Sequence, residues 1–267
     1  MSVVRAGMVW MTAFVGATPA ACASAQHQTD SSVEAGVERL AGAAARPQFR
    51  SASDSLAWAR TRDAAARARG FRVVVSLFDR RLWTIRGPDT LLTATVAVGM
   101  DSILRFGKKA WDFETPRGRR VVESKDKDPV WVPPDWHYVE AAQHHGLRLE
   151  RLVRGRPVTL ADGQKLEVRG DIVQLVATDG TRTPLPIGDE IIFDGVLYAP
   201  PLDTRNRRIA GELGRYRLDL GGGILLHGTP DVESIGLAAT HGCIRLGDDD
   251  IEWLFTHVPV GTSVYIY

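Results

Sequence analysis

The chain has 267 residues, of which 44% are hydrophobic and 24% are charged, and its formal net charge is +1. This composition predicts a globular core and argues against wholesale disorder. The near-neutral charge gives no sign of the clustered basic surface that nucleic acid requires, so no nucleic-acid partner is expected.

The N-terminus resembles a secretory signal peptide. Arg5 precedes an uncharged run over 6–17, and the small residues Ala23-Ser24-Ala25 follow. The run is too short for an ordinary membrane span. We expect a signal peptide over 1–25, with Ala21-Cys22-Ala23 as an alternative cleavage site, and a periplasmic or cell-envelope location.

Only two cysteines occur in the chain, Cys22 and Cys243. If Cys22 leaves with the signal peptide, the mature chain has one thiol and no internal disulfide. An unpaired thiol in an oxidising compartment is a liability unless it is used. A lipid anchor on Cys22 is the alternative, although Pro19 stands where a lipobox prefers leucine.

Residues 26–70 are rich in Ala and Arg. We interpret them as a linker followed by a helix over 53–69, with Ser53-Asp54 as the N-cap and Gly70 as the C-cap. A weak helix is predicted around Val33–Ala45.

From Phe71 onward the pattern is that of strands. The segments 73–78 and 82–85 predict a hairpin, and Leu91–Val98 predicts a third strand. Repeated Asp-Gly and Gly-Asp turn signals within 147–199 predict a β-rich insertion, which we place at about 136–205.

The C-terminal part predicts a strand that ends near His227, a short helix capped by Asp248-Asp249-Asp250, and a last strand within 261–267. Residues 71–267 are therefore expected to form one mostly β catalytic domain with few short helices.

The segment Thr240-His241-Gly242-Cys243 carries the chemistry, with His227 sixteen residues before the cysteine. Acyl transfer by cysteine needs a base, a group that orients the base, and backbone N–H groups for the oxyanion. Glycine before the thiol lets the backbone approach a substrate. The ordinary alternative is that Cys243 is a small buried hydrophobe.

Two histidines are candidates for the base. We favour His227, because a base from a different strand can reach the sulfur from across the site, and we assign His241 a positioning role. A zinc site made by His227, His241 and Cys243 is a weaker alternative, since no Cys-x-x-Cys or His-Glu-x-x-His motif occurs. No metal and no cofactor are expected.

These motifs resemble the signature of the L,D-transpeptidases, the YkuD-type catalytic domain of bacterial cell-wall enzymes. Thr115-Pro116-Arg117-Gly118 is similar to the family's Thr-Pro-x-Gly turn, and Gly214-Arg215-Tyr216-Arg217-Leu218 is similar to the strand before the histidine. The resemblance covers roughly 71–130 and 205–267 and implies a YkuD-like β-sandwich or barrel. The long segment 136–205 departs from the family pattern.

The resemblance implies roles for individual residues. Cys243 is then the nucleophile, His227 the general base and acid, and the main-chain carbonyl of Gly228 the group that orients His227. The N–H groups of His241, Gly242 and Cys243 are expected to meet the oxyanion. An imidazolium next to Cys243 is expected to lower the pKa of the thiol.

Two further residues complete the expected substrate-binding set with Gly228 and Gly242. Arg245 is suited to a substrate carboxylate, since a guanidinium makes two parallel hydrogen bonds to one, although a structural ion pair is the alternative. Thr240, at the start of the motif, is the second.

The implied partners are peptidoglycan stem peptides. Enzymes of this family attack the bond after the diamino-acid third residue, and the resemblance implies that an amine from a neighbouring stem, or a protein that becomes linked to the wall, takes the acyl group. The alternatives are a hydrolase of the L,D-carboxypeptidase or amidase type that shares the acyl-enzyme, and a metal-binding wall protein.

Overall fold

The computed structural model describes residues 47–267, which belong almost entirely to one unit, Gln48–Tyr267. The expected signal peptide, its cleavage site, Cys22 and the weak helix around Val33–Ala45 lie outside the described residues. The division into domains stays a prediction.

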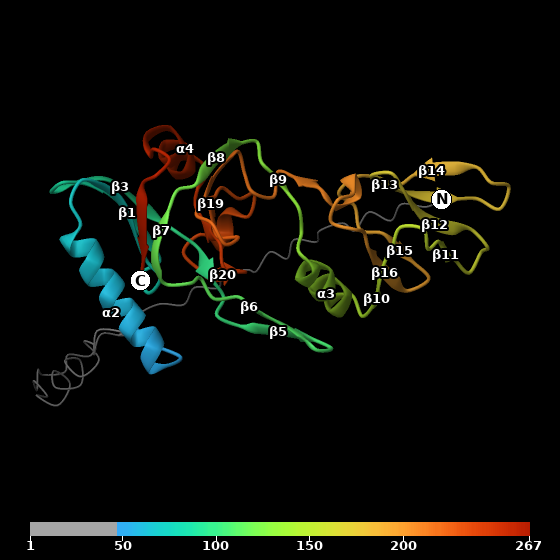
Figure 1. The fold of residues 1–267 in the computed structure, drawn as a ribbon, viewed down its shortest axis with the longest axis horizontal. Helices are drawn as coiled ribbons and strands as arrows, with labels where there is room; N and C mark the ends of the chain where they lie inside the picture. The colour runs from blue at the N-terminus through green and yellow to red at the C-terminus, as the bar shows by residue number, and fades with distance from the viewer. Residues whose placement is uncertain (1–46) are drawn as a thin grey trace, which may run out of the picture. The chain divides into compact units, whose positions relative to one another are not determined.

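The first described helix is α2, Ala52–Arg67 (Figure 1). Its N-cap is Ser51 and not Ser53-Asp54, because the hydroxyl of Ser51 accepts a hydrogen bond from the N–H of Asp54 at 3.1 Å. The C-cap is Ala68, so the helix ends two residues earlier than predicted. The side chain of Asp54 forms an ion pair with Arg117 and accepts a hydrogen bond from the N–H of Arg50 at 3.3 Å.

A five-stranded sheet has the order β3-β2-β1-β22-β7. Its strands are β1 Phe71–Ser76, β2 Arg81–Arg86, β3 Asp89–Thr95, β7 Gly118–Val121 and β22 Ser263–Ile266. The predicted hairpin and the C-terminal strand are confirmed. The strand expected over Leu91–Val98 instead ends at Thr95, and Val98–Gly99 forms a separate strand, β4.

A second, four-stranded sheet carries the candidate site and has the order β21-β19-β18-β8. Its strands are β8 Ser124–Lys127, β18 Tyr216–Asp219, β19 Leu225–His227 and β21 Ile244–Arg245. Fully buried aliphatic side chains such as Val73, Leu218 and Ile244 join the two sheets in one core. This core is the rigid support on which the site is built.

Helix α4, Asp248–His257, closes this core with Ile251 and Leu254. Its N-cap is Gly247, and the predicted capping by the aspartates is wrong. Asp248, Asp249 and Asp250 occupy the first turn, where their negative charge favours the positive end of the helix dipole.

The segment between β9, Val130–Trp131, and β17, Ile209–Ala210, contains the predicted β-rich insertion, which is confirmed. Its strands form two sheets, β10-β16-β15 and β11-β12-β13-β14, with their own hydrophobic core. They are β10 Arg148–Arg151, β11 Val158–Thr159, β12 Lys165–Arg169, β13 Ile172–Val176, β14 Arg182–Pro184, β15 Ile192–Phe193 and β16 Val196–Ala199.

The insertion begins with a helix that the sequence did not predict, α3, Asp135–His144 (Figure 1). The other elements are β5 Ile103–Phe106, β6 Lys109–Asp112, β20 Ala238–Thr240 and two short 3-10 helices, η1 Arg205–Arg207 and η2 Val232–Ser234. Among residues 47–267, no helix combines the length and apolar character needed to cross a membrane.

Candidate active site

The loop that carries Cys243 is held in shape by Thr240, the last residue of β20. The buried hydroxyl of Thr240 donates to the carbonyl oxygen of Cys243 at 2.5 Å and accepts from the N–H of Gly242 at 3.2 Å. The N–H of Gly242 is therefore already bonded to Thr240.

Glycine is required at position 242. Its φ is +117°, and a Cβ there would lie 3.2 Å from the carbonyl oxygen of Glu114. A side chain would therefore meet both backbone strain and a close contact. The loop before Cys243 passes against the segment that carries Glu114 because no Cβ stands between them.

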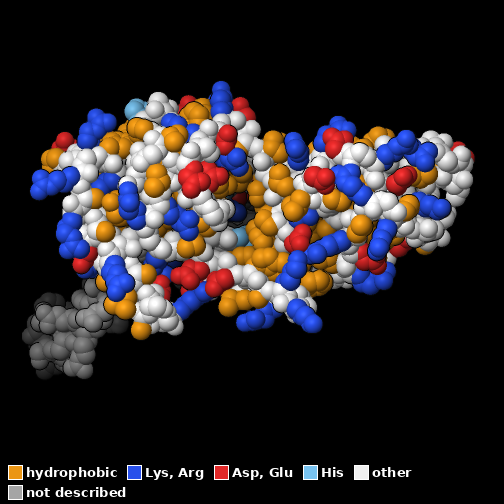
Figure 2. Space-filling view, in the orientation of Figure 1, with side chains coloured by type: hydrophobic (Ala, Val, Ile, Leu, Met, Phe, Trp, Pro, Cys, Tyr) orange, Lys and Arg blue, Asp and Glu red, His pale blue; other side chains and the backbone are white. Residues whose placement is uncertain are grey.

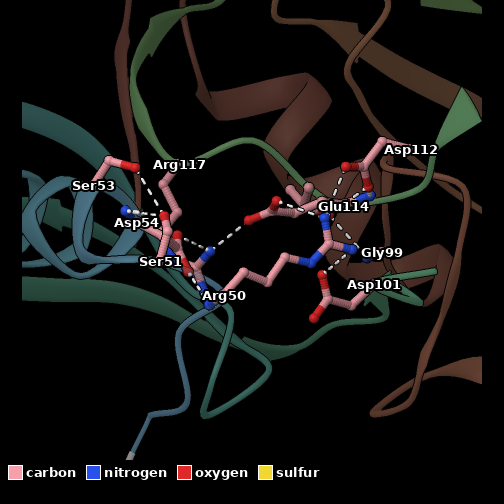
Figure 3. A network of polar contacts seen from close by, with 10 residues as sticks. Arg50, Ser51, Ser53, Asp54, Gly99, Asp101, Asp112, Glu114 and Arg117 are labelled. Atoms are coloured by element: carbon pink, nitrogen blue, oxygen red, sulfur yellow. Dashed lines mark hydrogen bonds and ion pairs between the residues drawn. The ribbon is translucent and has the colours of Figure 1, made fainter. Parts of the chain in front are cut away.

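A polar network anchors the segment that carries Glu114 (Figure 3). Arg117 binds Asp54 of α2 and Glu114, each at 2.6 Å, and Arg50 binds Asp112 at 2.7 Å. Burial is the largest effect on Glu114 and raises the pKa of its carboxyl group, while Arg117 opposes it. The network thus connects the residues before α2 to the backbone on which Gly242 rests.

The Thr-Pro-x-Gly turn lies in this same segment. The hydroxyl of Thr115 accepts a hydrogen bond from the N–H of Gly99 at 2.8 Å. Met100, which directly follows β4, also contacts the motif, because its N–H donates to the carbonyl oxygen of Thr240 at 2.8 Å. The turn therefore supports the Cys243 loop and does not itself line the cavity around the thiol.

His227 ends β19 and is 4% exposed. Its Nδ1 lies 2.6 Å from the carbonyl oxygen of Gly228. Because a carbonyl only accepts, Nδ1 carries the proton, and the neutral ring presents the lone pair of Nε2. Burial is the main cause that lowers the pKa of His227 to about 4, so the imidazole is neutral at pH 7.

Cys243 and His227 line the same cavity of about 300 Å³. The half-buried thiol lies 3.7 Å from the carbonyl oxygen of Gly223. Burial raises the pKa of Cys243, which corrects the expectation of a thiolate paired with an imidazolium. The resting pair is a neutral thiol and a neutral imidazole, so the proton must move during the attack.

The wall of this cavity combines aromatic, aliphatic and charged side chains. Figure 2 shows the surface hollowed near the middle of this face, with hydrophobic side chains at its border. The cavity is lined by Trp131, Pro134, Trp136, His137, Glu140, Ile209, Glu212, Leu213, Gly223, Leu225, His227, Thr240, His241, Cys243 and Arg245.

His241 is enclosed by two aromatic rings and a carboxylate. Its ring stacks on Trp136 with centroids 3.9 Å apart and meets the edge of Phe113 at 4.4 Å. Its Nε2 lies 2.7 Å from a carboxylate oxygen of Glu140. Burial is the larger influence and lowers the pKa of His241, whereas Glu140 acts to raise it.

Arg245 lies beside His227, since β19 and β21 are parallel and these two residues are paired in register. Its guanidinium forms an ion pair with Asp231 at 3.5 Å and is 17% exposed. The structural ion pair that was the alternative for Arg245 is therefore present. The side chain also lines the cavity that Cys243 and His227 share.

In the described part of the chain, no three His, Cys, Asp or Glu side chains gather as a metal site. His227, His241 and Cys243 share the cavity wall, but each imidazole already has a different hydrogen-bond partner.

Comparison with known proteins identifies the family. The family model of the L,D-transpeptidase catalytic domain, YkuD, matches residues 70–266. The chain belongs to the L,D-transpeptidase family. The match spans the insertion as well as the two segments whose motifs resemble the family.

Individual relatives match over shorter stretches. The chain is 40% identical over 88 residues to the probable L,D-transpeptidase ErfK/SrfK of Salmonella typhimurium, covering 27% of this chain and 28% of that protein. It is 54% identical over 46 residues to the probable L,D-transpeptidase YcfS of Escherichia coli, covering 17% and 14%. The matches thus span less than a third of these relatives.

Among solved structures, an L,D-transpeptidase from Xylanimonas cellulosilytica is 14% identical, with a TM-score of 0.39 over 89% of this chain and 70% of that chain.

Several cavity residues of this L,D-transpeptidase domain were missed by sequence reasoning. Trp136 and Glu140 are four residues apart, which places them on one face of α3. The spacing was visible in the sequence, but it has meaning only once a helix is recognised there. Glu212 and Leu213 lie just before β18, and no motif or spacing in the sequence marked them as cavity residues.

Proposed function

We propose that this protein is an L,D-transpeptidase that acylates Cys243 with a peptidoglycan stem peptide and passes the acyl group to an amine. The observation that carries the proposal is the shared cavity of Cys243 and His227, with Nδ1 of His227 bonded to the carbonyl of Gly228. Because Nδ1 carries the proton, the lone pair of Nε2 is free to accept a proton, as a general base must. Membership of the family supports the same chemistry.

In the acylation step, Nε2 of His227 takes the thiol proton while the sulfur attacks the carbonyl carbon of the third stem residue. The bond from this carbon to the terminal D-residue breaks, and the proton from His227 goes to the leaving amine. A thioester on Cys243 and a free D-residue result. In the second step an acceptor amine attacks the thioester, and Nε2 of His227 takes its proton and returns it to the sulfur.

A neutral thiol and a neutral imidazole in the resting enzyme suit this order of steps. With the pKa of His227 lowered and that of Cys243 raised, the thiol keeps its proton until a substrate enters. His227 then removes the thiol proton during the attack itself, so the resting enzyme does not need a thiolate. An unpaired thiol protected in this way is also less exposed to oxidation.

The oxyanion is assigned to the N–H groups of His241 and Cys243, because the N–H of Gly242 is bonded to Thr240. Thr240 is assigned the role of holding the loop that carries Cys243 in shape, and not direct contact with substrate. Arg245 is assigned to a substrate carboxylate, since its charged group lines the cavity beside His227.

The proposal places the protein in the periplasm or cell envelope, released by cleavage of the signal peptide, with a lipid anchor on Cys22 as the alternative. Its acceptor is a neighbouring stem or a wall-linked protein. Hydrolysis of the same thioester by water is the competing outcome.

Product analysis by mass spectrometry tests the proposal. Purified protein is incubated with tetrapeptide muropeptides in the presence and absence of an acceptor amine. Cross-linked products that increase with the amine support transfer, whereas tripeptide products alone would show hydrolysis. No release of the terminal D-residue by folded protein would contradict both reactions. The Cys243→Ser variant is the control.

A further inference from the structure

Helix α3 places a carboxylate on the second histidine of the cavity. Glu140 lies in the middle of Asp135–His144 and contacts Nε2 of His241 at 2.7 Å, from a position 101 residues earlier in the chain. The carboxylate is 35% exposed and the imidazole 22% exposed, so the pair is partly shielded from water. One turn before Glu140, Trp136 stacks on the same imidazole.

The face of α3 that points away from the cavity packs against the insertion. Tyr138 and Ala142 pack with Leu197 and Ala199 of β16 in a small separate cluster. The opposite face of the helix carries Trp136 and Glu140 toward the cavity. The insertion thus supports the face of α3 that is opposite to Trp136 and Glu140.

The start of α3 has a second anchor. Arg207, in η1 just before the chain re-enters the catalytic core, is 3% exposed. Its guanidinium donates to the carbonyl oxygens of Pro133 and Pro200 and to the carboxylate of Asp135, at 2.7, 2.8 and 2.8 Å. One buried arginine therefore ties the two ends of the insertion to the first turn of the helix.

We propose that Glu140 is a positioning residue for the reaction, which holds His241 in one tautomer and one orientation in the cavity wall, and that the insertion serves to deliver α3 to this place. The inference deepens the proposed function and rests on it. Because a carboxylate only accepts, Glu140 requires the proton of neutral His241 on Nε2. The stacked Trp136 prevents rotation of the ring out of this plane.

A fixed His241 also affects the loop that carries Cys243. His241 is two residues before Cys243, so a fixed imidazole also fixes the backbone whose N–H groups face the oxyanion. Glu140 also favours the protonated form of His241 electrostatically. The other titratable or charged groups that share this wall are His137 on α3, Arg245 on β21, and Cys243, His227 and Glu212.

Three variants and a control test the role of Glu140. Glu140→Gln keeps the size of the side chain and a hydrogen-bond acceptor but removes the charge. His241→Gln removes the partner, and the double variant closes the cycle. Glu150→Gln neutralises an exposed carboxylate on β10 and is the matched control. All must keep the thermal transition of the wild type before they are compared.

The first measurement needs no substrate, so it stays informative if the proposed function fails. The ring signals of His241 are followed by NMR as the pH is changed and are assigned with His241→Gln. Glu140→Gln should lower the pKa of His241 relative to the wild type, because the favourable charge is lost. Glu150→Gln should leave it unchanged. An unchanged pKa in Glu140→Gln would overturn the proposal.

The second measurement is the rate at which Cys243 is acylated by a carbapenem, a β-lactam that membership of the family leads us to expect will react with this thiol. Glu140→Gln should slow it roughly tenfold, the order expected when a hydrogen bond to a charged group is lost. In the His241→Gln background, the same change at position 140 should have almost no further effect. Equal slowing in both backgrounds would show that Glu140 does not act through His241. A wild type that fails to acylate while the NMR shift is present would count against the proposed function alone.

Discussion

The buried neutral imidazole of His227 predicts how the protein loses stability in acid. Burial lowers the pKa of this group from 6.5 to about 4 in the folded protein, while the unfolded chain titrates near the ordinary value. Between these values the unfolded chain binds a proton that the folded protein excludes. The free energy of unfolding therefore falls as the pH falls from 6.5 toward 4. The stability that depends on a neutral His227 is fully present only above pH 6.5.

The magnitude follows from the same two values. A tenfold change in a proton-binding constant is worth about 1.4 kcal/mol, so the full effect is about 3 kcal/mol, and about 2 kcal/mol of it is lost between pH 8 and pH 5. Such a loss is a large fraction of the stability of an ordinary domain. It is measurable by urea denaturation, where the midpoint moves in proportion.

His227→Gln isolates this contribution. The variant has no titrating group at this position, yet its amide can still donate to the carbonyl of Gly228. Contributions from groups that the substitution does not touch are common to both proteins and cancel in the comparison. Between pH 8 and pH 5 the wild type should lose about 2 kcal/mol more than the variant. His145→Gln, at an exposed position, should follow the wild type. Equal losses in wild type and His227→Gln would refute the buried neutral imidazole.

Three further predictions concern the chemistry. Cys243→Ser replaces the thiol by an alcohol that is far harder to ionise, so acylation by a carbapenem should disappear while the thermal transition stays. In the wild type, the adduct should map to this residue alone. His227→Gln should cost roughly 10²–10⁴-fold in acylation rate, and His241→Gln should cost less and keep the pH dependence of the base; the reverse order would exchange their roles. Gly242→Ala, whose Cβ would lie 3.2 Å from the carbonyl oxygen of Glu114 at a φ of +117°, should introduce strain of about 1–3 kcal/mol and slow acylation. Unchanged kinetics and stability would show that the loop adapts.

The sequence was sufficient for the first hairpin, for the strand that ends at His227 and for finding the motif around Cys243. Val73 to Phe78 and the residues before His227 carry β-branched and alternating patterns, which are local signals. The motif around Cys243 is also local, and its distance from His227 is short enough for neighbouring strands. These features depend on nearby residues, so they were open to prediction.

The features that sequence reasoning missed depend on tertiary packing. Helix α3 begins after Pro134 without a side-chain cap, and its buried face packs against strands β16 and β10, so the Trp- and Pro-rich stretch gave no local helical signal. The contact between Glu140 and His241 follows from that docking. The pKa of Cys243 was predicted in the wrong direction, because the sequence names a neighbouring imidazole but does not show how deeply the pair is buried.

The most direct test of the account is to trap the acyl-enzyme. Wild-type protein is mixed with a tetrapeptide stem, quenched in acid during turnover, digested and mapped by mass spectrometry. The peptide that contains Cys243 should carry the mass of the tripeptide acyl group, and hydroxylamine should remove it, as expected for a thioester. Turnover without such an adduct on Cys243, or an adduct on another residue, would contradict the central claim.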